Sequence, residues 1–141
     1  MKRIYLLLFV AVIIAACDRD FPVYPPSDGP QGSYAYTGYD STGVALVKGW
    51  LTITFADSVC ITGDWKFARV AVGQGLGPQI GDGQLVGGRD NNEVWINLNP
   101  QMRDNNVLLR GILDETTYQG DWTWVTFAGP TTGGAFTAVK K

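Results

Sequence analysis

The residues that could carry chemistry in this chain are few, and their types exclude most catalytic arrangements. The 141 residues include no histidine and only two cysteines. That removes the commonest general base, the commonest metal ligand and every Ser-His or Cys-His nucleophile. The serines Ser27, Ser33, Ser41 and Ser58 lie in no Gly-x-Ser-x-Gly or Ser-x-x-Lys motif. We therefore predict a protein that is not an enzyme and that uses no cofactor and no metal.

Pairs of carboxylates are the remaining route to catalysis, because glycosidases need only two acids. Asp64 and Asp121 each precede a tryptophan that we place on an inner face, so both carboxylates should point outward, away from any shared pocket. Asp114-Glu115 is typical of a turn. Asp90-Asn91-Asn92-Glu93 and Asp104-Asn105-Asn106 offer oxygens for calcium but lack the alternating ligands and central glycine of an EF-hand. Turn formation explains both segments.

The N-terminus has the order of a secretory signal. Met1-Lys2-Arg3 is basic, residues 4–14 are apolar, and Ala15-Ala16-Cys17 is a run of small residues. The apolar run is shorter than the ~20 residues that a membrane-spanning helix needs. We expect residues 1–16 to be a signal peptide that is removed from the mature protein.

Ile14-Ala15-Ala16-Cys17 resembles the lipobox of bacterial lipoproteins. The resemblance implies cleavage before Cys17, diacylglycerol on the Cys17 sulfur and often a further acyl chain on the new amine. Stable anchoring takes two or more chains, because each buried methylene contributes only ~0.8 kcal/mol. The protein would then be exported and anchored through its acyl chains to a bacterial membrane, inner or outer, or at the cell surface. The alternative is an ordinary cleaved signal that ends near a cysteine.

The charge of the mature chain argues against nucleic acid as a partner. Without Lys2 and Arg3, nine of the 11 basic residues remain against 13 acidic ones, a net charge of −4. No run of lysine or arginine offers a basic face to phosphates. With Cys17 acylated we expect no disulfide, and Cys60 is predicted to be a small side chain within a strand.

Residues 17–32 are predicted to form the lipidated N-terminus and a tether. Four of the seven prolines of the chain lie here, at Pro22, Pro25, Pro26 and Pro30. Such a segment favours extended polyproline geometry, and the fifteen residues from Asp18 to Gly32 at ~3.1 Å each would reach roughly 45 Å.

Residues 33–141 are predicted to be one all-β domain. Short alternating runs separated by turn residues predict an antiparallel meander of about eight strands, over 33–39, 45–56, 58–69, 79–86, 92–98, 106–114, 117–127 and 133–139. Several glycines, among them Gly49, Gly63, Gly111 and Gly120, fall mid-strand on the apolar side, where a sheet bends tightly. This favours a small closed up-and-down barrel, with a two-sheet sandwich as the alternative.

The aromatic residues are the remaining candidates for a site. The chain has five Trp, six Tyr and six Phe, and alternation places five of them inside: Tyr36, Trp65, Tyr118, Trp122 and Trp124. An eight-stranded barrel is just wide enough to be filled by side chains or to hold one small ligand. The five residues therefore either fill the barrel or line a binding pocket.

The domain loosely resembles the avidins and the wider lipocalin-like barrels. The likeness is carried by Gly32-Ser33-Tyr34, by the inward tryptophans late in the chain and by the ending Gly134–Lys140. It implies a strand pattern and carries no biotin-site residue to this chain. We interpret the protein as a cell-envelope lipoprotein whose non-catalytic barrel has a binding or structural role. The alternatives are a lipocalin-like carrier of a small apolar ligand and an inhibitor of an envelope-attacking enzyme, whose protein partner would meet a rigid acidic loop.

Overall fold

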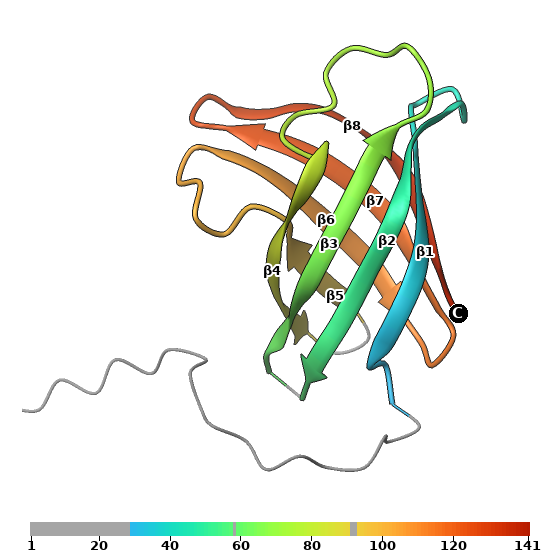
Figure 1. Cartoon of the computed structure of the whole chain (residues 1–141). Coiled ribbons are helices and arrows are strands. Elements are labelled where there is room, and N and C mark those ends of the chain that lie inside the picture. Colours follow the sequence, from blue (N-terminus) through green and yellow to red (C-terminus); the bar gives the residue numbers. More distant parts are fainter. Residues whose placement is uncertain (1–28, 58, 91–92) are drawn as a thin grey trace, which may run out of the picture.

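The computed structural model describes residues 29–57, 59–90 and 93–141, which form a closed antiparallel β-barrel (Figure 1). Its eight strands follow chain order: β1 Gly32–Tyr39, β2 Ala45–Ala56, β3 Ile61–Arg69, β4 Gly81–Asp90, β5 Glu93–Asn97, β6 Asn105–Leu113, β7 Thr117–Thr126 and β8 Gly129–Lys140. Each strand pairs with the next, and β1 closes the barrel on β8 with Tyr36 opposite Ala138. The predicted barrel is confirmed, and the sandwich is wrong.

Three strand boundaries differ from the predicted ones by three or more residues. β3 begins at Ile61 rather than 58, because the Asp57 carboxylate accepts the backbone N–H groups of Val59 at 2.7 Å and Cys60 at 2.6 Å and so forms a turn. β4 continues to Asp90 and β8 starts at Gly129, both beyond the predicted limits. Pairs of glycines interrupt the alternation of both strands in the sequence, although the backbone pairing runs through them.

Mid-strand glycines let neighbouring strands approach closely, as the sequence predicted. A Cβ at Gly63 would collide with the carbonyl oxygen of Thr52, and one at Gly120 with that of Arg110, both inside the 3.0 Å that real Cβ atoms essentially never breach. Gly120 also lies directly opposite Gly111. These positions give the sheet the strong curvature that a small barrel needs.

A β-bulge in β2 turns Phe55 away from the inner face on which strict alternation would place it. The register shifts between Ile53 and Phe55, so Phe55 pairs with Thr62 on the outer side instead of continuing the inner row. Thr52 faces outward before the bulge, is half-buried and shares a 2.9 Å hydrogen bond with the hydroxyl of Ser33. Between Val47 and Ile53 the more buried inner residues alternate with the more exposed outer ones.

The two ends of the barrel differ. The entry end is where the described chain begins (Figure 1), and two hydrogen bonds fix it there: Lys140 Nζ to the Gly29 carbonyl at 2.8 Å and Tyr34 Oη to the Pro30 carbonyl at 2.6 Å. Asp57 and Asp114 close hairpins at this end. Among the described residues, no helix is long and apolar enough to cross a membrane.

The far end is covered by the long loop 70–80, which joins β3 to β4 (Figure 1). Leu76 and Gln79 of this loop are buried. Asn99 Nδ2 donates to the Pro78 carbonyl at 2.8 Å, and Thr132 Oγ1 donates to the Gly75 carbonyl. Side chains from the β5–β6 connection and from β8 therefore hold the loop at the far end of the barrel.

Candidate functional site

The predicted site residues lie inside the barrel, and three of them belong to one continuous aromatic stack. The ring of Tyr36 lies on that of Phe67, with centroids 4.1 Å apart and an interplanar angle of 11°. Phe67 also contacts Trp65 at 5.1 Å. On the other side Tyr36 meets Phe136 at 5.7 Å, and Phe136 meets Tyr118 edge-on at 4.7 Å. The stack therefore runs Trp65–Phe67–Tyr36–Phe136–Tyr118, with every ring buried.

Trp122 and Trp124, the other two predicted residues, make different contacts. Trp122 is buried, and its indole N–H donates to the Tyr39 carbonyl at 2.7 Å. Trp124 is half-buried near the far end, and its N–H donates to Asn105 Oδ1 at 2.6 Å. Gly77 of loop 70–80 lies against the Trp124 ring, with φ of +61° and no room for a Cβ. Each indole thus bonds to the terminal residue of another strand, Tyr39 of β1 and Asn105 of β6.

Two residues of the stack were outside the predicted site. Phe67 lies on the inner face of β3, two residues after Trp65, and Phe136 lies in β8, whose predicted start at 133 was wrong. Both residues could be grouped with the predicted site only by knowing at which height along the barrel axis each side chain lies. Cross-strand register sets that position, and alternation within one strand does not reveal it.

The buried tyrosine hydroxyls are held in their neutral form. Burial raises the pKa of Tyr36 far above its ordinary value, and the pKa of Tyr118 is raised by burial and by the nearby Tyr36 and Glu93. Burial, together with the Asp114 carboxylate, raises the pKa of Tyr34 to about 12. Such groups do not exchange protons near neutral pH. Tyr118 Oη donates to the Val94 carbonyl at 3.1 Å, whereas Tyr36 Oη has no hydrogen-bond partner.

The carboxylates singled out in the sequence do not converge. Asp64 and Asp121 are exposed on the outside of the barrel, as predicted. Asp114 forms a turn by accepting the N–H groups of Thr116 and Thr117 at 2.8 and 2.6 Å. Within the described ranges, no group of three or more His, Cys, Asp or Glu residues is placed to hold a metal ion.

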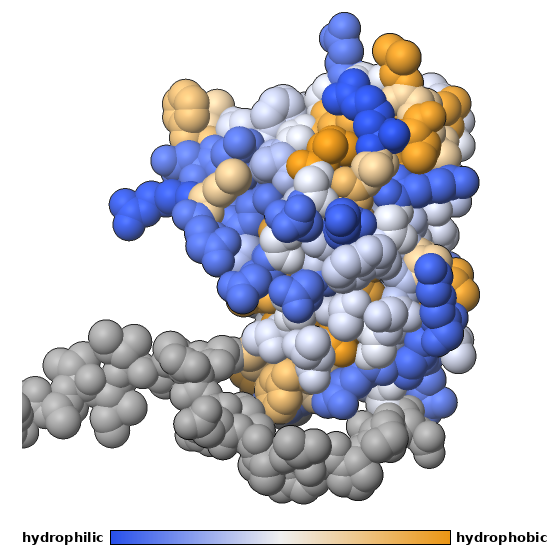
Figure 2. Space-filling view, viewed as in Figure 1, coloured by the Kyte–Doolittle hydropathy of each residue, from blue (hydrophilic) through white to orange (hydrophobic). Residues whose placement is uncertain are grey.

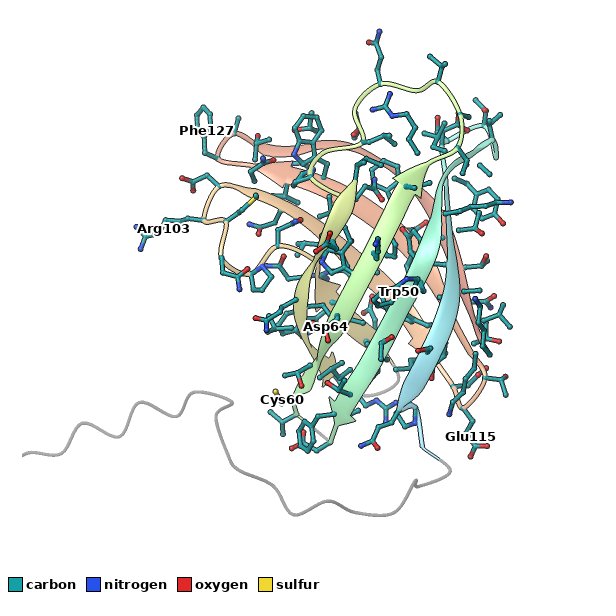
Figure 3. All side chains as sticks on the ribbon, in the orientation of Figure 1. Trp50, Cys60, Asp64, Arg103, Glu115 and Phe127 are labelled. Carbon is teal, nitrogen blue, oxygen red and sulfur yellow. The ribbon has the colours of Figure 1, made fainter. Side chains whose placement is uncertain are left out.

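Cys60 differs from its prediction. It precedes β3 and lies at the entry end (Figure 3), and the structure has it disulfide-bonded, where we expected a strand residue and no disulfide. The chain has one other cysteine, Cys17, which lies outside the described residues. One sulfur cannot be both acylated and disulfide-bonded, so lipidation of Cys17 and an intrachain disulfide are alternatives.

The outside of β2, β3 and β4 carries a hollow that the sequence reasoning missed. We call it the outer trough; Figure 3 shows two of its residues, Trp50 and Asp64, on the side facing the viewer. It consists of two adjoining depressions that share Asp64 and Gln84. The residues that line the first include Trp50, Asp64, Lys66, Asp82 and Gln84, and those that line the second include Thr54, Thr62, Asp64, Gln84 and Gln101, together with apolar residues such as Leu85 and Val86. In the sequence, each of these outward-facing residues looks like an ordinary solvated surface residue. Only the cross-strand register shows that they are neighbours.

Comparisons with protein-family models, with curated proteins and with solved structures found no match to this chain. The functional argument is therefore made from the residues of this chain.

Proposed function

We propose that this protein is a cell-envelope lipoprotein, anchored through acyl chains on Cys17, whose barrel is a filled, non-catalytic scaffold that binds its partner on the outside. The proposal that the barrel is filled and binds on the outside is supported by the aromatic stack across the interior. Its rings contact one another from Trp65 to Tyr118, and the inner leucine and isoleucine side chains around them are also buried. A stack in ring-to-ring contact occupies the space that a carrier would leave for its ligand.

The anchor half of the proposal is supported by the order of the N-terminal sequence and by the place where the barrel begins. The basic start, the apolar run and the residues Ile14–Cys17 follow the lipoprotein pattern. Gly29 and Pro30 are bonded to the entry end, so the far end and the outer faces of the strands are left accessible to a partner.

The inhibitor alternative has less support. It requires a rigid acidic loop, because enzymes that attack the envelope are basic. Loop 70–80 is rigidly held, but it contains no aspartate or glutamate. The carrier alternative requires open space beside the candidate aromatics, and those rings lie against one another.

Mass spectrometry of the purified protein tests the anchor directly. Trypsin should release Cys17-Asp18-Arg19 as an N-terminal tripeptide carrying diacylglycerol. Cys17→Ser should abolish that product and move the protein to the aqueous phase of a detergent separation. Cys60→Ser is the matched control and should keep the acylated tripeptide. A disulfide-linked peptide that joins Cys17 to Cys60, with no acyl chain on either, would contradict the anchor.

A further inference from the structure

The outer trough begins at an exposed tryptophan. Trp50 is 39% exposed although it lies in the middle of β2. Cross-strand pairing places Lys66 of β3 beside Trp50, and Asp82 of β4 beside Lys66. An exposed indole offers a ligand both an apolar ring and an N–H donor.

A second row of polar groups runs next to the first, two residues away along the strands. It contains Thr52, Asp64 and Gln84, opposite one another on β2, β3 and β4. Gln101, from the connection between β5 and β6, donates to Gln84 Oε1 at 3.5 Å and extends the row. Hydroxyl, carboxylate and amide groups therefore follow one another from strand to strand across the trough.

The charged groups of the trough are available to a ligand. Asp64, Lys66 and Asp82 are exposed, and within the described residues they form no hydrogen bond or ion pair through their side chains. Lys66 is positively charged and Asp64 and Asp82 are negatively charged, so these three residues give the trough a net charge of −1. The surrounding face is hydrophilic to neutral, and hydrophobic residues gather mainly at the far end (Figure 2).

We propose that the outer trough binds a neutral oligosaccharide lying across β2, β3 and β4. The C–H groups of a pyranose ring pack on the electron-rich face of an indole, and the indole of Trp50 is 39% exposed here. Sugar hydroxyls donate to Asp64 and Asp82 and exchange hydrogen bonds with the amides of Gln84 and Gln101. Neighbouring strands are about 4.8 Å apart, close to the length of one sugar unit, so successive units meet successive strands.

Other classes of ligand fit this surface less well. Phosphate-bearing chains are repelled by a trough with two carboxylates and one amine. A lipid or other apolar ligand would leave the carboxylates and amides without partners. The inference deepens the external-binding half of the proposed function and makes no use of the lipid anchor.

Calorimetric titration of the purified protein, with the N-terminus that its host gives it, tests the site. The probes are β-1,4-linked tetrasaccharides of glucose and of N-acetylglucosamine, with tetragalacturonate as the anionic control. We expect saturable binding of at least one neutral probe and weaker binding of the anion. Trp50→Ala should lower the affinity by about ten-fold or more, since exposed aromatic anchors dominate such contacts. Asp64→Ala should lower it as well, by a smaller factor.

Trp95→Ala is the matched control. Trp95 is 42% exposed and mid-strand on the outside of β5, opposite Arg110 of β6, and it lines neither depression of the outer trough. The affinity of this variant should equal that of the unaltered protein. Absence of binding by both neutral probes would overturn the inference and leave the acyl anchor and the filled interior standing. Binding that survives Trp50→Ala, or that Trp95→Ala abolishes, would overturn the placement at the trough.

Discussion

Two tryptophans on the neighbouring strands β2 and β3 face opposite sides of the sheet and have different roles. Trp65 of β3 points inward, is 3% exposed and stacks on Phe67, while its N–H donates to the Leu98 carbonyl at 2.6 Å. Trp50 of β2 points outward, is 39% exposed and lies between polar side chains. Because successive side chains of a strand point to opposite faces of the sheet, the position of each tryptophan in its strand decides whether its indole fills the core or is accessible to a partner.

The largest expected effect is on the inner indole. Trp65→Ala should lower the free energy of unfolding by ~3–5 kcal/mol, because it leaves a void inside a close-packed stack and removes the bond to Leu98. Trp50→Ala should stay within about 0.5 kcal/mol of the unaltered protein. Denaturant unfolding of the two variants measures the difference. Equal midpoints would mean that the interior is not packed as described.

Glycine positions on the inner face sharpen the comparison further. Gly63→Val and Gly120→Val should each lower the free energy of unfolding by ~1–3 kcal/mol or more, because the new side chain meets the backbone of the next strand. Lys48→Val, at an exposed position of β2, is the control and should have an effect within about 0.5 kcal/mol. Thermal unfolding of all three variants checks the order, and a valine tolerated at Gly63 would contradict the close approach of the strands.

Two buried hydroxyls in the same stack should respond in opposite ways to removal. Tyr118→Phe loses the hydrogen bond to the Val94 carbonyl and should lower stability by about 0.5–1.5 kcal/mol. Tyr36→Phe removes a hydroxyl that has no partner and should leave stability unchanged or raise it. The pair is compared by urea midpoints at fixed pH. A larger loss for Tyr36→Phe would show that its hydroxyl does have a partner.

The turns should give the smallest effect, and it depends on pH. Hydrogen bonds to backbone N–H groups lower the pKa of Asp57 and Asp114, and bonds from Thr42 and Val44 lower that of Asp40. A lowered pKa in the folded state adds stability above the unfolded value of about 3.9, which is lost as the pH falls through the folded pKa. Unfolding followed from pH 5 to pH 2 should show this loss, and Asp114→Asn should flatten it. Equal slopes for both proteins would contradict the role of Asp114.

Much of the fold was predictable because it depends on local signals. Alternation gave the number of strands, and mid-strand glycines such as Gly63 and Gly120 indicated the curvature of a closed barrel. The bulge that turns Phe55 outward was not predictable, because nothing in residues 53–55 distinguishes an inserted residue from a continuing strand. The continuation of β4 to Asp90 was hidden by adjacent glycines.

The candidate site was predicted less completely, and for a physical reason. Sequence alone placed Tyr36, Trp65 and Tyr118 inside, but whether they line a space or close it depends on ring-to-ring distances that only the register sets. The outer trough was not predicted from the sequence for the same reason. Trp50, Asp64 and Gln84 are far apart in the chain and become neighbours only through the pairing of three strands.

The central claim is that the interior is filled and that binding occurs outside. Methyl-resolved NMR during titration with palmitate, a small apolar probe of the carrier class, tests it most directly. We expect the methyl resonances of the inward Leu51, Ile53 and Leu109 to keep their positions up to the solubility limit of the probe. Saturable shifts of those three residues, with no shift of the exposed Val72, would show a ligand inside the barrel and contradict the account.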